Sequence, residues 1–390
     1  MNSNLRSMLP VYMIMLLSST LQSVSISGPV MPLYIHSLGI GIIDWSLLVT
    51  SSALGMFLFE WIWGTLSDRV NGKHLMLFST IAMSIILPLY AIPFPVTYFF
   101  VLQFIWGAIC VVLSPITRSY VSGEAPPESV GLMVSLLWAF GALGRIIGPL
   151  VGSYLAEYCS FGCSFYASSA MALVLACVVV LTFPKTGRRT TQRATPSHRA
   201  ILKERSVWLL FLSTVFTLMT FPLMRSFLPL YASQQIGMSA FEVGTLLSAT
   251  AAAQLVAIPL FGWLSDRFGR KLVVVVGFGS SSVMFLFFLV AGTQSWLFLV
   301  SMAVSVGLSA TSLLLAMIPE IAPNSRYGTH VGLYGSSEDL GTIIGPIIFG
   351  FVWSAFSPVL IFIVGSIVQL VSALLILGIR PKRVPRPTMD

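Results

Sequence analysis

Apolar residues follow one another along this chain in stretches too long for the core of a soluble domain. Five stretches contain no Asp, Glu, Lys or Arg: 7–43, 74–117, 158–184, 272–319 and 340–379. A helix that crosses a membrane needs about 20 predominantly apolar residues, so each stretch has room for at least one crossing. The pattern predicts an all-α membrane protein.

Glycine, proline and charged residues divide these stretches into twelve predicted membrane-spanning helices. They are 8–35, 42–66, 74–93, 96–122, 129–157, 162–184, 206–234, 239–264, 271–292, 294–322, 327–356 and 358–380. The first resembles a signal peptide, because Arg6 precedes an apolar run. That run continues to Tyr34 without a cleavage site of small residues, so we predict a first span that is retained.

The composition excludes several classes of protein. Hydrophobic residues make up 56% of the 390 residues and charged residues 9%, whereas soluble domains carry roughly 25% charged residues. A soluble enzyme, a nucleic-acid-binding domain and a disordered chain are therefore excluded. An outer-membrane barrel is excluded too, because its strands would be about 10 residues of alternating polarity.

The basic residues predict how the chain crosses the membrane. With the N-terminus inside, 19 of the 21 Lys and Arg fall in inner loops or tails and none in outer loops. Cytoplasmic loops carry such an excess. We therefore expect a multi-pass protein of the cell (inner or plasma) membrane with both termini in the cytoplasm. The two remaining basic residues, Arg145 and Arg225, fall inside predicted spans.

Four short motifs recur at an almost constant spacing. GTLSDRVNGKH at 64–74 returns as GWLSDRFGRKL at 262–272, and GRIIGPLVG at 144–152 returns as GTIIGPIIFG at 341–350. MPLYI and an Ala-Pro pair also recur, and every offset is 197 or 198 residues. We therefore predict two homologous six-helix halves. The predicted divisions are the first half 1–184, a basic cytoplasmic linker 185–205, the second half 206–380 and a cytoplasmic tail 381–390.

The loop motif G-x-L-S-D-R-x-G-R-K, between the second and third helices of each half, resembles the signature of the major facilitator superfamily. The Gly-Pro motif of the fifth helix resembles that of the twelve-helix drug:proton antiporters of this superfamily. The resemblance covers essentially the whole chain. It implies two pseudo-symmetric six-helix bundles around a central cavity, working by alternating access.

The resemblance assigns a gating role to the two loop motifs. Their residues are Gly64, Asp68, Arg69, Lys73, Gly262, Asp266, Arg267, Gly269, Arg270 and Lys271. Each aspartate would latch onto the N-terminus of a helix in the other half, where free N–H groups suit an anion, and the basic residues would pair with acids or lipid phosphates. The alternative is an ordinary basic turn. The first motif departs from the pattern at Asn71, which tolerates a left-handed conformation, and at Gly72, where a basic contact is missing.

The fifth-helix motif has two interpretations of equal weight. Its residues are Gly141, Gly144, Gly148, Pro149 and Gly152. Glycines four apart line one helical face, so another helix can pack closely, and the resemblance instead relates the motif to export. The eleventh helix carries a similar copy, Gly341, Gly345, Pro346 and Gly350.

Charged residues inside predicted spans are candidates for proton coupling, because such residues are costly in a membrane. The candidates are Asp339, Glu338, Glu60 and Arg145. For Glu60 we prefer a static salt bridge with Arg118. For Asp339, whose alternative partner is Arg145, we prefer a role in coupling. The helix-four arginine that the family often has is replaced by Gln103.

Candidates for the substrate cavity mix apolar, aromatic and amide groups, which suits amphipathic ligands. They are Gln22, Tyr34, Gln103, Trp138, Phe221, Met224, Arg225, Gln254 and Met317. Arg225 either attracts an anionic substrate or extends to the lipid headgroups. Cys159 and Cys163 flank a predicted outer turn. A disulfide between them is one possibility, and two unpaired residues at helix ends is the preferred one.

We expect a secondary transporter, preferably for proton-coupled efflux of small amphipathic or drug-like molecules. The alternative is uptake or efflux of a polar metabolite such as a sugar or an organic anion, which the two intramembrane arginines favour. No catalytic constellation, channel filter or nucleotide-binding loop is recognisable, so we expect neither an enzyme nor a channel nor use of ATP. The expected partners are a small-molecule substrate, protons and the lipid bilayer. We expect a monomer without nucleic acid, cofactor or metal.

Overall fold

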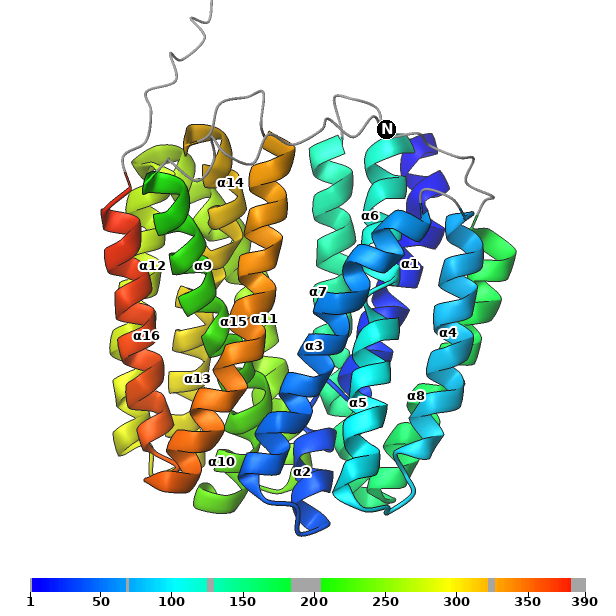
Figure 1. Ribbon diagram of the computed structural model, residues 1–390, viewed down its shortest axis with the longest axis horizontal. Coiled ribbons are helices and arrows are strands. Elements are labelled where there is room, and N and C mark those ends of the chain that lie inside the picture. Colours follow the sequence, from blue (N-terminus) through cyan, green and yellow to red (C-terminus); the bar gives the residue numbers. More distant parts are fainter. Residues whose placement is uncertain (1, 68–69, 125–129, 184–204, 322–326, 380–390) are drawn as a thin grey trace, which may run out of the picture. The chain divides into compact units, whose positions relative to one another are not determined.

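The computed structural model describes residues 2–67, 70–124, 130–183, 205–321 and 327–379, which are almost entirely helical and contain no strand (Figure 1). The helices of the first part are α1 (Asn2–Val24), α2 (Val30–Ser37), α3 (Ile42–Ser67), α4 (Gly72–Leu89), α5 (Val96–Cys110), α6 (Leu113–Glu124), α7 (Val130–Tyr158) and α8 (Phe161–Thr182). Those that follow are α9 (Arg205–Pro222), η2 (Leu223–Phe227), α10 (Leu228–Ile236), α11 (Ala240–Phe268), α12 (Arg270–Leu286), η3 (Phe287–Val290), α13 (Gln294–Leu308), η4 (Ser309–Thr311), α14 (Ser312–Ile321), α15 (Tyr327–Ala355) and α16 (Leu360–Leu377).

Ten helical segments of the described ranges are long and apolar enough to cross a membrane. The shorter apolar helix Met8–Val24 and the 29-residue α15 are consistent with the predicted total of twelve. The prediction of an all-α, multi-pass membrane protein is confirmed.

Several of the predicted helices contain an irregularity: the first is divided between α1 and α2, while the fourth, seventh and tenth each stay one candidate span with a turn, a π-helical turn or a 3-10 turn inside it. Gly28 and Pro29 lie in the segment between α1 and α2. Pro115 follows the break between α5 and α6. A proline ring inside a helix clashes with the carbonyl group four residues earlier, which here belongs to Val111, directly after α5. The apolar runs therefore predicted where these spans lie but not where their helices become irregular.

The seventh predicted helix contains a different irregularity. Between α9 and α10 the chain forms the π-helical turn η2, which carries Arg225. Pro229 stands four residues after Arg225 and cannot donate an N–H bond to its carbonyl group. Such π-helical turns occur frequently at functional sites, so η2 brings a charged side chain and an irregular backbone to the same point.

The chain forms two compact units: unit 1 comprises residues 1–192 and 224–255, and unit 2 comprises 193–223 and 256–390. In unit 1, α1 packs along α7, α3 along α5 and α4 along α8 (Figure 1). In unit 2, α9 packs along α15 and α12 along α16. The α1–α7 and α9–α15 pairs are equivalent in the sequence repeat, as are α4–α8 and α12–α16. The division into two homologous halves is defined by that repeat and stays a prediction.

An aromatic cluster forms part of the interior of unit 1. The ring of Tyr34 lies 6.2 Å from that of Phe99 and 5.3 Å from that of Phe165, and Tyr90 stacks on Phe165 at 5.6 Å. All four side chains are less than a tenth exposed. Tyr34, a predicted cavity residue, is therefore part of the packed interior, where aromatic pairs add to the energy of burial.

Candidate functional site

The two loop motifs form different turns. The Asn71 side chain caps α4 by accepting a hydrogen bond from the backbone N–H of Lys73 at 3.0 Å, with extended backbone angles of −60° and 126°. Gly269, before α12, has a φ of +86°, which favours glycine. The expectation of a left-handed Asn71 is wrong, because a capping asparagine replaces the glycine turn. No described atom lies within 4 Å of a Cβ built on Gly64 or Gly262.

A lysine of each motif binds the end of another helix in its own unit. The Lys73 ammonium group donates a hydrogen bond to the carbonyl oxygen of Val180, near the end of α8, at 2.7 Å. Lys271 donates to the carbonyl oxygens of Leu377 and Ile379, at the end of α16, both at 2.7 Å. The last carbonyl groups of a helix lack intrahelical donors and form its negative end. Each lysine therefore ties the start of one helix to the end of another.

This contact follows the sequence repeat, since Lys73 and Lys271 are 198 residues apart and Val180 and Leu377 are 197 apart. The pairing of these lysines with acids or lipid phosphates stays a prediction, and the partners that the structure gives them are helix-end carbonyl groups. A helix end offers the same attraction for a cation without a second charged side chain.

Arg270 pairs with an acid, as predicted, and the first motif lacks this pair altogether. Nη1 of Arg270 lies 3.2 Å from Oε1 of Glu320 and also donates a hydrogen bond to the carbonyl oxygen of Ala316. These contacts join α12 to α14. Gly72 and Gly123 stand at the repeat-equivalent positions of Arg270 and Glu320. The missing basic residue of the first motif is thus accompanied by the loss of its acidic partner.

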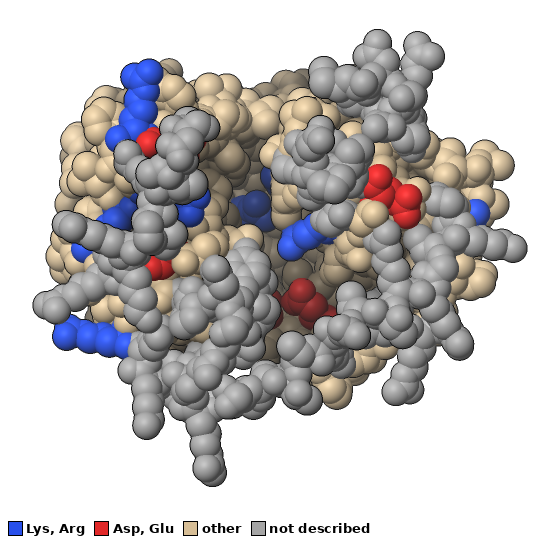
Figure 2. Space-filling view, turned by 90° about the horizontal axis from the view of Figure 1, so that it is seen from above, with Lys and Arg blue, Asp and Glu red and all other residues tan. Residues whose placement is uncertain are grey.

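Asp68 and Asp266 are the acidic residues of the two predicted gating latches. Asp68 and Arg69 lie outside the described residues. Asp266 is exposed on the last turn of α11, and the neighbouring Arg267 places its guanidinium carbon 4.2 Å from the ring centre of Trp263. Both latches would join helices of different halves, so they stay predictions. Figure 2 shows basic and acidic side chains of the described residues on the face viewed from above.

The fifth-helix motif packs α7 closely against α1. A Cβ built on Gly144 would lie 2.7 Å from the carbonyl oxygen of Leu16. The carbonyl group of Pro149, inside α7, accepts a hydrogen bond from the Ser153 hydroxyl at 2.6 Å. On α15, Gly341 and Gly345 approach backbone atoms of α9 in the same way. The packing interpretation thus has a direct structural basis, whereas a role in transport direction stays a prediction.

The salt bridge predicted for Glu60 is absent among the described residues. The Glu60 and Arg118 side chains lie close enough for their charges to interact, but they form no ion pair. The Arg118 guanidinium carbon lies 4.9 Å from the ring centre of Trp138 instead. Arginine favours such stacking on an aromatic face, which explains the difference.

On α15 the two predicted coupling acids occupy adjacent positions and are half-buried. Glu338 forms a side-chain hydrogen bond with Tyr334, one turn earlier. Asp339 follows it in the chain. The pairing of Asp339 with Arg145 joins residues of different units, so it stays a prediction.

Two arginines lie near one another in unit 1. Arg145 on α7 is half-buried and Arg225 on η2 is exposed, and their positive charges act on each other. Arg145 forms no hydrogen bond or ion pair with any described residue. An anion bound between two guanidinium groups would offset their mutual repulsion. This pair is therefore a candidate anion site.

The remaining cavity candidates fall into two groups. Gln22, Trp138, Phe221 and Gln254 are exposed or half-buried. Gln103, Met224 and Met317 are buried, like Tyr34. Gln103 is only 2% exposed, and its Oε1 has no hydrogen-bond partner among the described residues. The buried residues do not line an accessible surface in this structure.

Sequence reasoning missed two hydrogen bonds that join distant parts of unit 1. Oε2 of Glu157, on the last turn of α7, accepts a hydrogen bond from the backbone N–H of Phe241 at 2.6 Å. The Trp45 indole N–H donates to the carbonyl oxygen of Ser226, in η2, at 3.2 Å. Neither contact has a sequence signal, because the partners are far apart in the chain. Only the local Ser-x-x-Glu pattern at Ser239, typical of a helix start, was visible.

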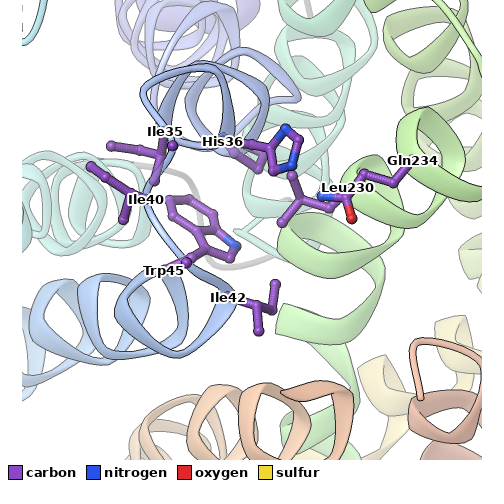
Figure 3. Close-up of a pocket in the computed structure, with 10 residues that line it drawn as sticks. Ile35, His36, Ile40, Ile42, Trp45, Leu230 and Gln234 are labelled. Carbon is purple, nitrogen blue, oxygen red and sulfur yellow. The ribbon is translucent and has the colours of Figure 1, made fainter.

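A pocket of about 240 Å³ lies beside Trp45 (Figure 3). Its lining residues are Pro32, Ile35, His36, Gly39, Ile40, Gly41, Ile42, Trp45, Leu230 and Gln234. Ligand pockets of about 300 Å³ or more are typically apolar with a few polar groups. This pocket has that character, with His36 and Gln234 as its polar members, but it is somewhat smaller.

Cys159, directly after α7, and Cys163, in the first turn of α8, form a disulfide. The preferred interpretation of two unpaired residues is therefore wrong. Among the described residues Cys110, which is buried, and Cys177, which is exposed, are free thiols.

Comparison with known proteins agrees with this architecture. The model of the Major Facilitator Superfamily matches residues 11–242 and 210–389. An MFS-type transporter of Methanocaldococcus jannaschii is 23% identical over 85% of this chain and 88% of its own length. Multidrug resistance protein MdtG of Enterobacter lignolyticus is 25% identical over 90% and 86%, respectively. The solved structure of nucleoside transporter NupG has a TM-score of 0.79 at 14% identity and covers 96% of this chain and 98% of that one. With its family model matched along nearly its whole length, the chain belongs to the Major Facilitator Superfamily of membrane transporters.

Proposed function

We propose that the protein is a secondary active transporter that couples proton entry to efflux of small amphipathic or drug-like molecules by alternating access. The observation that carries the proposal is its similarity to a multidrug resistance protein over 90% of the chain. The glycine-rich motif of α7, which resembles that of drug:proton antiporters, supports it. In this proposal the protein is a monomer of the cell membrane with cytoplasmic termini, and its two loop motifs gate the cytoplasmic side.

Proton coupling rests on the charged residues of the spans. Asp339, with Glu338 and Glu60 as further candidates, would carry the proton, and Arg145 would stabilise the ionised acid in one state of the cycle. A carboxylate that loses its positive partner in surroundings of low dielectric constant takes up a proton. Loss and recovery of the Arg145 contact by Asp339 during the cycle would then couple proton movement to substrate movement.

A second candidate function is transport of an organic anion, and the Arg145–Arg225 pair in unit 1 favours it. The two candidate functions differ in whether proton and substrate move in the same direction or in opposite directions. An anion that competes with ionised Asp339 for Arg145 binds best when Asp339 is protonated, so proton and substrate travel together. A neutral or cationic substrate that favours ionised Asp339 travels against the proton.

The test is the sign of the pH change inside proteoliposomes when a substrate is added outside. Drugs, sugars and organic anions are added in turn, and a pH dye reports the vesicle interior. Antiport makes the interior more alkaline as substrate enters, and this is the expected result for amphipathic drugs. Acidification with organic anions would replace the first proposal by the second, and no pH change with any compound would refute proton coupling.

A further inference from the structure

The pocket beside Trp45 lies between the two copies of a repeated motif. MPLYI at 31–35 is part of α2, and LPLYA at 228–232 is part of α10. The two helices pack against one another within unit 1, and the turn from α2 to α3 contributes the lining residues 39–41. None of the predicted cavity residues lines this pocket, so the proposed function does not account for it.

The pocket has an apolar floor and a polar rim. The side chains of Ile35, Trp45 and Leu230 are at most 3% exposed, whereas those of His36 and Gln234 are exposed. Figure 3 shows His36 and Gln234 on the same side of the Trp45 ring. Neither His36 nor Gln234 forms a side-chain hydrogen bond with another described residue, so both can bond to a ligand that covers the ring.

Hydrogen bonds within the protein hold the walls of the pocket in place. The Trp45 indole N–H donates to the carbonyl oxygen of Ser226, in η2, at 3.2 Å, which fixes the orientation of the ring. In the turn, the N–H of Gly39 donates to the carbonyl oxygen of His36 at 2.9 Å, with a φ of +75° at Gly39 that favours glycine. A site that is ordered in advance loses less conformational entropy when a ligand binds.

The lining indicates the chemistry of the ligand. None of the ten lining residues is Asp, Glu, Lys or Arg, which disfavours a charged molecule. The volume of about 240 Å³ is below the roughly 300–1,000 Å³ of typical ligand pockets, so one ring or two fused rings fit best. An aromatic ring packs favourably against the Trp45 indole, and the Gln234 amide offers both a donor and an acceptor at the rim.

We propose that this pocket binds a small uncharged aromatic molecule with one hydrogen-bonding group, at the end of the protein that is predicted to face outside. The ring of the ligand lies on Trp45, and its polar group bonds to the Gln234 amide. Because the ligand contacts α2, α3 and α10 together, its binding favours the arrangement in which these helices meet. The inference goes beyond the proposed function, since binding here requires neither transport nor a proton.

Binding of a fluorinated probe to the purified full-length protein tests the proposal. The probe is 5-fluoroindole, which is uncharged, has two fused rings and carries one N–H donor. Its ¹⁹F NMR linewidth, measured at increasing probe concentration and corrected for detergent alone, gives the Kd. We expect saturable binding to the wild type. Gln234→Leu removes the amide and keeps a side chain of similar size, so it should raise the Kd by about two- to tenfold, the effect of one hydrogen bond.

Two further variants locate the binding site. Gln235 is the matched control, because it is the next residue of α10 and is also exposed but does not line the pocket; Gln235→Leu should leave the Kd unchanged. Gln234→Trp places a large ring at the rim and should abolish saturable binding.

Three outcomes would contradict the proposal. Linewidths that never saturate in the wild type would mean that the probe only partitions into detergent, and the site would be refuted. Saturable binding that survives in Gln234→Trp would place the probe elsewhere. An equal Kd for the wild type and Gln234→Leu would refute the hydrogen bond and with it the class of ligand. A failure of proton-coupled transport in vesicles bears only on the proposed function, because this titration involves no transport.

Discussion

The glycines of the α7 motif should differ in their tolerance of alanine. A Cβ built on Gly141 would lie 3.1 Å from the terminal methyl group of Met15, which can rotate away. On Gly152 it would overlap the backbone carbonyl group of Val24, which cannot move without α1. Ordinary contact begins near 3.4 Å. The same substitution is therefore harmless at one end of the motif and disruptive at the other.

The intermediate glycines complete a graded series. At Gly144 the nearest atoms of α1, which include the Cβ of Ser19, would be 2.7 Å away, and at Gly148 the Cβ of Ser23 would be closer still. Alanine gains about 1 kcal/mol over glycine inside a helix, whereas overpacking costs about 1–3 kcal/mol. We expect Gly141→Ala to be neutral or up to about 1 kcal/mol more stable, and Gly152→Ala to lose up to about 2 kcal/mol overall, near the upper end because its overlap is with backbone.

Thermal unfolding of the purified protein in detergent measures the series. In a domain of 150–250 residues, 1 kcal/mol shifts Tm by about 2–4 °C, so the two ends of the motif should differ by several degrees. Gly279→Ala, at a glycine with no described atom near the new Cβ, is the control and should not lower Tm. Equal Tm values for Gly141→Ala and Gly152→Ala would refute the packing argument. Unchanged stability with lost transport in all four variants would favour the interpretation by transport direction.

Two further predictions concern the lysine contacts and the topology. Lys73→Ala and Lys271→Ala should each lower stability by about 0.3–1 kcal/mol, the value of a cation at a helix end; a Tm equal to that of the wild type for both would show that the carbonyl contacts contribute nothing. A reporter active only in the cytoplasm should work when fused after Pro184 and fail when fused after Phe94, because all inner loops carry the basic residues; activity after Phe94 would contradict the twelve-helix arrangement.

The sequence was sufficient for the fold because lipid imposes one strong requirement on it. Membrane-spanning stretches such as 272–319, which holds two helices, are recognisable from the absence of charge alone. The breaks within spans were not recognisable, because Pro115 and Pro229 lie in apolar runs that tolerate a proline in either a kinked or a broken helix. Whether the helix kinks or breaks at the proline depends on whether neighbouring helices satisfy the backbone groups that the proline leaves without a partner.

The candidate site was predicted less completely than the fold. Motif spacing located Lys73 and Lys271, but their partners are carbonyl groups of helices more than 100 residues away, which no side-chain pattern indicates. Backbone acceptors and donors are present at every residue, so a sequence does not reveal which of them tertiary packing leaves near a charge. The bond between Glu157 and the N–H of Phe241 escaped prediction for the same reason.

A comparison of driven transport with exchange in the Asp339→Asn variant tests proton-coupled transport most directly. The variant imitates the protonated acid and retains its size, so substrate binding and exchange between equal substrate concentrations on both sides should continue in proteoliposomes. Accumulation of substrate driven by a pH gradient should be lost in the variant and present in the wild type. If Asp339→Asn still concentrates substrate under a pH gradient, Asp339 is not the essential coupling site, and proton coupling through this acid is contradicted.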